Sequence, residues 1–190
     1  MTVRKNCIGK IVRFISLFAL CMTASPSFLF SIMSAEASRD SDTSVTVVVD
    51  CQIEFSEDVL EAFKSRIPIT IQTTIKIYQV RKNLWDKLIH EYVTRDVLSS
   101  SSLYLNYFLK SADRNVNGSY TSLEAMLEAL GMHRTHQIEL AENTLHADRS
   151  YVGKVRISID RSALPFVMQL PVFFNHAWRL KSEQVKFNIQ

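Results

Sequence analysis

Three histidines and an aspartate lie close enough together in the sequence to suggest a metal site. His133 and His136 are three residues apart, and His146 and Asp148 follow them. A zinc site needs three or four nitrogen, sulfur or oxygen ligands that converge in a tetrahedron. His133 and His136 flank the expected end of a helix, so helical spacing does not hold both imidazoles on one face. We therefore expect solvated loop histidines, with no bound metal and no other cofactor.

Two tryptophans and an aspartate are the candidates for contact with a ligand or a partner. Asp86 follows Trp85 directly, and a carboxyl group beside an apolar ring suits a general acid. The same two residues also fit a packing anchor and a surface acid. Trp178, together with Phe173 and Phe174, fits either the lining of a ligand groove or the core of a sheet. We take Trp85, Asp86 and Trp178 as speculative contact residues.

The sequence offers no catalytic residue that we can assign. A serine nucleophile commonly lies at a glycine-flanked elbow, and none of the 4 glycines frames a serine in that way. The adjacent acids Glu57 and Asp58 are explained by the start of a helix, where the helix dipole favours negative charge. Cys51 lies among valines and an isoleucine and is expected to be a buried small hydrophobic residue. A reactive thiol or an intermolecular disulfide is the alternative.

The first 37 residues have the composition of an export signal or a membrane anchor. Residues 1–13 are basic, 14–33 are mostly apolar, and Ala35 and Ala37 give the small residues that precede a signal-peptidase site. We favour cleavage after Ala37, although 20 mostly apolar residues also suffice to span a bilayer. In either case the domain that follows is expected outside the cytoplasm, in the periplasm or anchored to the inner membrane. Membrane contact is expected only through residues 14–33, and only without cleavage.

Charge gives no reason to expect nucleic-acid binding. The chain has 22 basic and 19 acidic residues, and four of the basic and one of the acidic residues belong to residues 1–37. The remainder therefore carries 18 of each sign. Nucleic-acid binding depends on an excess of lysine and arginine against phosphate, which this domain lacks.

Hydrophobic periodicity divides the rest of the chain mainly into strands. The clearest signal is the alternation in 67–77, where isoleucines share one face and polar residues share the other. The segment 84–98 also fits a helix, but we favour a strand because the preceding strand needs a hairpin partner. Turns are expected at 99–102 and 117–118. The expected strands are 45–55, 67–77, 84–98, 103–109, 136–141, 151–160, 171–181 and 184–189.

Two helices are expected between these strands. The first covers 56–65, with Ser56 as its N-cap. The second covers 121–131, where Thr121 and Glu124 have the spacing of a capping box and a glycine ends the helix. The predicted fold class is therefore α+β, with a largely antiparallel sheet or half-open barrel and two helices packed on one side. Residues 38–44 are expected to form a flexible lead, and 45–190 a single globular domain.

Five short motifs occur in an order that resembles a known family. This family is the bacterial exported one catalogued as domain of unknown function 4390. The resemblance implies an extracytoplasmic protein whose relatives are encoded near a membrane histidine kinase and a response regulator of the nitrogen-regulation type, and it implies no activity. The chain departs from the family at Arg66, where members tend to carry glycine. The motifs are SRIPIT at 65–70, LWD at 84–86, YTSLEA at 120–125, DRSALP at 160–165 and WRLKS at 178–182.

Together these features predict an interaction module of the bacterial envelope. It would act through a sheet face or an exposed strand edge, with an envelope protein such as a membrane sensor as its partner. The alternative is a periplasmic protein that binds a small ligand or lipid in a cavity of about 300 Å³ or more between sheet and helices. An enzyme ranks third.

Overall fold

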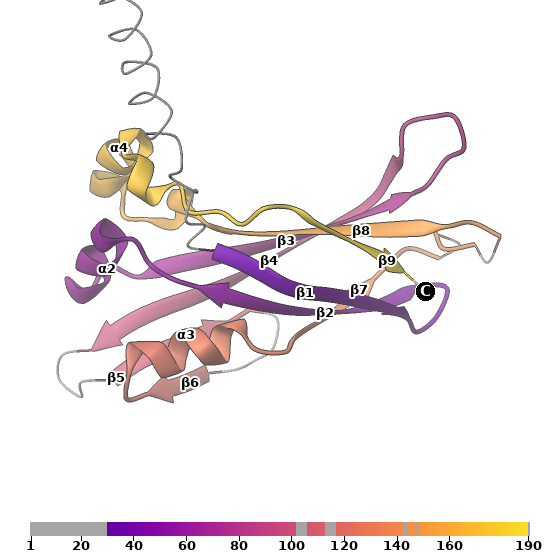
Figure 1. The fold of residues 1–190 in the computed structure, drawn as a ribbon. Helices are drawn as coiled ribbons and strands as arrows, with labels where there is room; N and C mark the ends of the chain where they lie inside the picture. Colours follow the sequence, from indigo (N-terminus) through magenta and orange to yellow (C-terminus); the bar gives the residue numbers. More distant parts are fainter. Residues whose placement is uncertain (1–29, 102–105, 113–116, 143, 147, 190) are drawn as a thin grey trace, which may run out of the picture.

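The computed structural model of the protein describes residues 30–101, 106–112, 117–142, 144–146 and 148–189. They form one nine-stranded sheet in the order β6-β5-β4-β3-β8-β9-β1-β2-β7 (Figure 1). Neighbouring strands are antiparallel except β1 and β9, which run parallel, so the sheet is largely antiparallel, as expected, but mixed. The strands are β1 (Phe30–Arg39), β2 (Ser44–Ile53), β3 (Ile69–Gln79), β4 (Lys87–Ser101), β5 (Asn106–Ser111), β6 (Asn117–Tyr120), β7 (Arg134–Glu139), β8 (Tyr151–Ile159) and β9 (Val185–Ile189).

Three α-helices accompany the sheet in the described residues, where two were expected. They are α2 (Glu57–Lys64), α3 (Leu123–Gly131) and α4 (Phe166–Phe174), with short 3₁₀ turns η1 (Arg161–Ala163) and η2 (His176–Trp178) on either side of α4. Helices α2 and α4 lie at one end of the sheet, whereas α3 contacts both β2 and the hairpin of β5 and β6 (Figure 1). None of the described helices is long and apolar enough to cross a membrane.

Strand β3 carries the alternation that the sequence shows most clearly. It pairs with β4 on one side and with β8 on the other. Its inward residues Ile69, Ile71, Thr73, Ile75 and Ile77 are all fully buried. The period-two pattern arises because successive side chains of a strand point to opposite faces. The expected strand is thus confirmed, and it forms the floor of the core.

The sheet curls until its edge strand β7 faces β4, which makes the molecule a half-barrel. Arg134 of β7 forms an ion pair with Asp96 of β4, and both side chains are buried. Two residues further along β7, the His136 ring lies 5.9 Å from the Tyr92 ring of β4. The described parts of these two strands share no backbone ladder. The contact between β4 and β7 is therefore made by side chains, and not by backbone hydrogen bonds between the described parts of the two strands.

Helix α4 replaces part of a strand that was expected at 171–181. Pro165 starts the helix with φ −52°, and the Met168 N–H donates to its carbonyl oxygen at 2.8 Å. The run that follows is apolar throughout, so its pattern does not distinguish a strand period from a helix period. Pro171 lies inside the helix, which is poorly compatible with a central strand as well. The strand prediction for this segment was therefore wrong.

Local turn chemistry explains several smaller differences. Arg66 has φ 68°, in the left-handed region that favours glycine, so its position in the turn between α2 and β3 is one where glycine would be less strained. The N-cap of α3 is Ser122, which accepts from the Ala125 N–H, and not Thr121. Residues 99–101 continue β4 and Asn117–Tyr120 form β6, where turns were expected. Residues 102–105, which belong to the expected turn and strand there, lie outside the described residues.

Strand β1 covers residues that were expected to form the end of a signal and a flexible lead. Residues 1–29 lie outside the described residues, but Phe30 is buried and pairs with Ile53 of β2. Ser38 and Arg39 end β1, and Ser44 already begins β2. Because β1 lies between β9 and β2, cleavage after Ala37 would remove eight residues from the inside of the sheet. Processing compatible with this fold lies before Phe30.

We predict that a chain starting at Leu29 folds and that a chain starting at Ser38 does not. Loss of most of β1 leaves β2 and β9 without their common neighbour, and a typical domain has only roughly 5–15 kcal/mol of stability to lose. Thermal unfolding followed by circular dichroism distinguishes the two chains. A cooperative transition of the 38–190 chain at the midpoint of the longer chain would contradict the role given to β1.

The buried pair that closes the barrel gives a second prediction. Asp96→Ala should destabilise the protein by about 3–5 kcal/mol, because it leaves the Arg134 guanidinium charged and unpaired in the interior. The double variant Asp96→Leu with Arg134→Met should be less destabilised than Asp96→Ala, since it removes both charges. Urea unfolding at pH 7 measures both. A double variant at least as unstable as the single one would show that the pair does not act as a unit.

Candidate functional site

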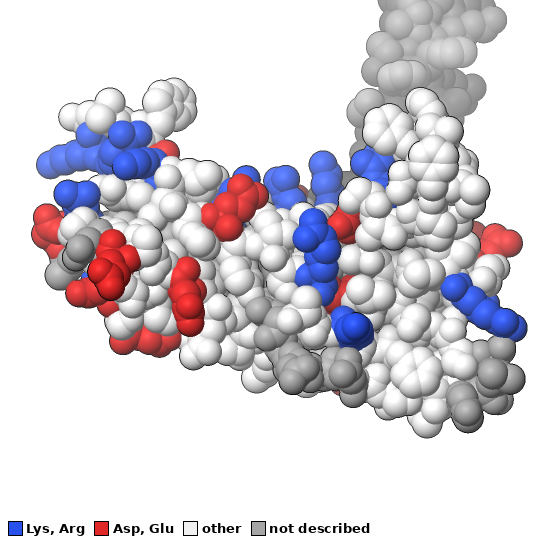
Figure 2. All heavy atoms as spheres, turned by 180° about the vertical axis from the view of Figure 1, so that it is seen from behind, with Lys and Arg blue, Asp and Glu red and all other residues white. Residues whose placement is uncertain are grey.

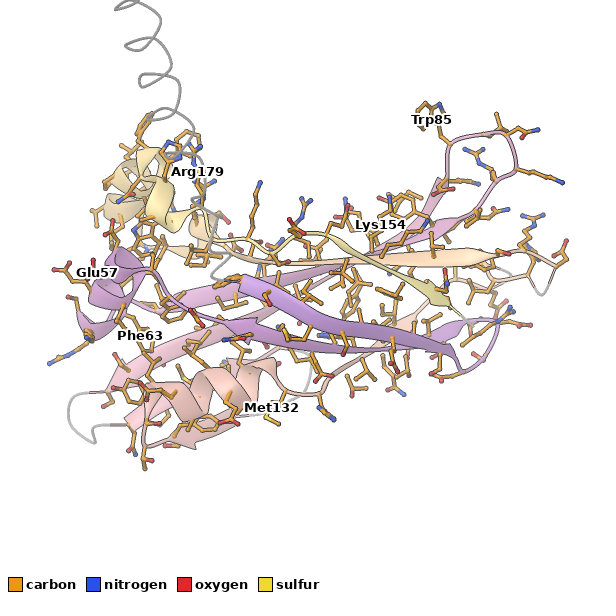
Figure 3. The ribbon with its side chains drawn as sticks, in the orientation of Figure 1. Glu57, Phe63, Trp85, Met132, Lys154 and Arg179 are labelled. Carbon is orange, nitrogen blue, oxygen red and sulfur yellow. The ribbon has the colours of Figure 1, made fainter. Side chains whose placement is uncertain are left out.

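The three speculative contact residues do not form a common site. Trp85 and Asp86 lie at the tip of the hairpin between β3 and β4, where the Trp85 side chain is 90% exposed. Trp178 lies in η2 and is only 4% exposed. Figure 3 shows Trp85 and Arg179, the neighbour of Trp178, at opposite ends of the molecule. Trp178 thus belongs to the core, whereas the adjacent phenylalanines of α4 are exposed.

The histidines of the suggested metal site also point apart. His133 is exposed in the turn after α3, with φ 45°, whereas His136 is buried inside the barrel. The expectation of a solvated loop is therefore wrong for His136, which lies on β7. His146 and Asp148 are both exposed. Within the described parts of the chain, no three histidine, cysteine or carboxylate side chains are placed to hold a metal ion.

A groove of about 400 Å³ with a mainly apolar lining lies between α2 and α3, with β2 as its floor. Figure 3 shows Met132 just beyond the end of α3, close to β2. Apolar side chains from all three elements form most of its lining. The lining residues are Cys51, Gln52, Ile53, Glu54, Phe55, Leu60, Leu123, Glu124, Leu127, Glu128 and Met132.

The groove exists because β2 extends beyond its neighbour β7. The ladder between β7 and β2 ends at Val49, whereas β2 continues to Ile53 and pairs there with β1 alone. Helix α3 packs beside this unpaired edge, and a Cβ atom on Gly131 would overlap the Cys51 carbonyl oxygen. Glycine is thus required for the close approach of helix and strand. The expectation that Gly131 is a C-cap missed this reason, since the C-cap is Met132.

The charged residues of the lining are all acidic. Glu124 and Glu128 lie one helical turn apart on α3, and Glu54 faces them from the chain after β2. Among the residues that the structure describes, no lysine, arginine or histidine lines the groove. The sequence contained part of this signal, because Leu123 and Leu127 share the same spacing as the two glutamates. The pattern alone does not show that these two leucines stay partly exposed.

Cys51 and Asp50 lie side by side at the α3 end of β2. Burial raises the pKa of the Cys51 thiol, although the neighbouring Arg134 guanidinium opposes this effect. Asp50 accepts from the His133 N–H at 2.7 Å and from the Ser34 hydroxyl at 3.0 Å. The His133 backbone hydrogen bond contributes most to a lowered pKa of the Asp50 carboxyl. Cys51 is therefore a buried neutral thiol, as expected, and Asp50 is a charged clamp on the turn after α3.

The clamp predicts a pH-dependent stability. A group whose pKa is lower in the folded state stabilises that state above its unfolded pKa, about 3.9 for aspartate, and loses this effect as the pH falls through the folded pKa. Asp50→Ala should therefore lower the thermal midpoint at pH 7, and the difference from the parent chain should shrink below about pH 4. The same change at exposed Asp86 serves as the control. An equal difference at pH 7 and pH 3 would contradict the clamp.

Comparison with known protein families gives one match, which covers most of the chain. Residues 29–188 match the family model described as Domain of unknown function (DUF4390). No curated protein and no solved structure matches the chain. The match begins one residue before β1 and ends within β9, so it includes both the groove and the barrel. The resemblance seen in five short motifs is thereby confirmed, and the chain belongs to the family Domain of unknown function (DUF4390).

Proposed function

We propose that the protein is an interaction module of the bacterial envelope whose α2–α3 groove binds an extended apolar peptide segment carrying positive charge. The observation that carries this proposal is the groove itself, which combines a floor of apolar side chains with three glutamates and no basic residue. Apolar side chains of a bound segment would be removed from water in the groove. Lysine or arginine residues of that segment would meet the acidic rim, which favours specificity and association rate.

The edge of β2 supports a peptide in strand conformation. Beyond Val49 this strand has a partner on one side only, and the groove lies along the other side. Extended peptides commonly bind by adding a strand to such an edge, while pockets for alternate side chains select the sequence. The segment available here is short, from Gln52 to Phe55, because Gly131 covers the Cys51 carbonyl. Side-chain contacts with Leu123 and Leu127 would therefore supply much of the affinity.

The proposed location outside the cytoplasm is supported by the N-terminal sequence. Basic residues 1–13 precede the apolar run, which is the order found in export signals and in anchors that keep their basic flank in the cytoplasm. A membrane sensor is the partner class that the family resemblance implied. A segment exposed on such a sensor would fit the groove if the segment combined apolar and basic residues.

A small apolar ligand is the second candidate, because the groove has the volume that such a ligand needs. Its 400 Å³ falls within the usual range of small-molecule sites. The three glutamates argue against a fatty acid, whose carboxylate they would repel. The peptide is therefore the better-supported occupant, and a neutral lipid chain is an outcome of the test.

A charge reversal on α3 tests the proposal. Glu124→Lys with Glu128→Lys should weaken binding of a fluorescent peptide with alternating valine and lysine at least ten-fold in anisotropy titrations. The same reversal on α2, Glu57→Lys with Glu61→Lys, is the matched control because neither residue lines the groove. A peptide with glutamate in place of lysine should bind the parent chain weakly.

The readouts separate the two occupants. Slower reaction of a thiol introduced by Met132→Cys with a small methanethiosulfonate reagent in the presence of the peptide would place the peptide in the groove, since Met132 lines the groove and is 56% exposed. Equal binding of the lysine and glutamate peptides would contradict the charge argument. Saturable binding of a neutral alkyl probe, with no peptide bound, would make the groove a lipid site and overturn the proposal.

A further inference from the structure

Helix α4 exposes an unusually apolar surface. Its side chains Phe166, Val167, Leu170, Phe173 and Phe174 are between 57% and 81% exposed, and only Val172 of this helix is buried. Figure 2 shows an uncharged surface at the end of the molecule that carries α4, with basic side chains beside it. Exposed apolar clusters of this kind mark sites that are covered by another molecule or by a membrane.

The fold holds α4 in place with its apolar face outward. The Gln169 side chain donates to the carbonyl oxygens of Ser162 and Leu164 at 3.1 and 2.9 Å. Beyond the helix, the Asn175 amide donates to Asp58 of α2 at 2.6 Å. These contacts join the helix to the segment before it and its C-terminal end to α2. The exposed face is therefore a feature of the folded domain, and not of a loosely attached segment.

The N-terminal part of the chain enters the domain at the same end. Phe30 pairs with Ile53, and three residues after Ile53 the Ser56 hydroxyl donates to the carbonyl oxygen of Ala177 in η2, just after α4. The 29 residues before Phe30 include the apolar run that begins at residue 14. A bilayer reached by that run would therefore lie at the end of the barrel that carries α4.

The charges near α4 suit the surface of a membrane. The Arg161 guanidinium lies over the Phe173 ring, 5.6 Å from its centroid, and exposed Arg179 follows η2 (Figure 3). Helices that lie in a membrane interface combine aromatic and aliphatic residues on one face with basic residues at its border. Arginine beside the apolar face can reach the phosphate groups of lipids, whereas the aromatic rings contact the acyl chains.

We propose that α4 lies in the interface of an anionic membrane and holds one end of the barrel against the bilayer. This adds a contact to the N-terminal segment, which was the only membrane contact expected from the sequence. The contact is independent of the peptide groove proposed above, because no residue of α4 lines that groove. A bilayer is the occupant in this proposal, and a second copy of the chain or a partner protein would contradict it.

Spin labels on the full chain test this contact directly. Val167→Cys places a label on α4, and Trp85→Cys places one on the opposite hairpin tip, which is also exposed. In both proteins Cys7 and Cys21 are replaced by serine. The chain is reconstituted in vesicles of phosphatidylethanolamine and phosphatidylglycerol. The label at 167 should be more accessible to oxygen than to a water-soluble nickel chelate, and the label at 85 should show the reverse. The N-terminal segment is the same in both proteins.

Three results would overturn the proposal. In the first, the label at 167 has the same nickel accessibility as the label at 85, which would show that α4 lies in water. Dipolar broadening that disappears on dilution with unlabelled chain would show that a second copy covers α4. A third variant carries the label at Phe174→Cys together with Val167→Glu and Leu170→Glu. If this label is still more accessible to oxygen than to the nickel chelate, the apolar face of α4 is not responsible for the membrane contact. Peptide binding in the groove should be unchanged by these two substitutions, so the failure of one proposal is distinguishable from that of the other.

Discussion

The ion pair between Arg134 and Asp96 determines how far the sheet can curl. The two residues are 38 positions apart and lie on strands that are separated by six steps in the sheet order. Removing both charges from water has a large unfavourable free energy, which the pair offsets only when the two groups meet. The curl that brings β7 to β4 is the arrangement that allows this. The remaining inward residues of the two strands follow, with His136 beside Tyr92.

The position of β7 in turn determines the place of α3. Only Met132 and His133 separate α3 from β7, so α3 must lie close to the start of β7. Because β7 faces β4, this places α3 between β2 and β5, and it contacts both strands. Asp50 secures this turn, and Gly131 allows the helix to touch β2. The groove is then the space between α3 and α2 over the part of β2 that β7 does not cover. A charge pair in the core thus shapes a surface feature that it does not contact.

Local patterns in the sequence predicted the elements whose stability is local. The alternation of β3 and β8 and the apolar stripe of α3 can be read directly, because each depends on one face turned to the core. A half-open barrel was one of the two sheet forms expected, but the contact between residues 96 and 134 that closes it could not be predicted, since no periodicity reveals it. The burial of His136 was missed as well, although a strand was expected from this residue onward, because the alternation does not show which face of that strand turns inward. The strand expected at 171–181 was wrong because the apolar residues at its start belong to α4 and face solvent, and a rule that places apolar residues in the core then favours a strand.

The exposed face of α4 and the groove lie close to one another in the fold. Helix α2 forms one wall of the groove, and it is joined to the α4 region through Asp58 and Asn175. If α4 lies on a bilayer, the groove is near the membrane, and the hairpin tip with Trp85 is the part that extends away from it. A strand of 11 residues such as β3 spans roughly 36 Å at 3.3 Å per residue. A segment of a membrane protein that emerges close to the bilayer would therefore reach the groove more readily than the hairpin tip. The geometry thus favours a partner that is itself held in the membrane, because both molecules would then be confined to the same surface and meet at a high effective concentration.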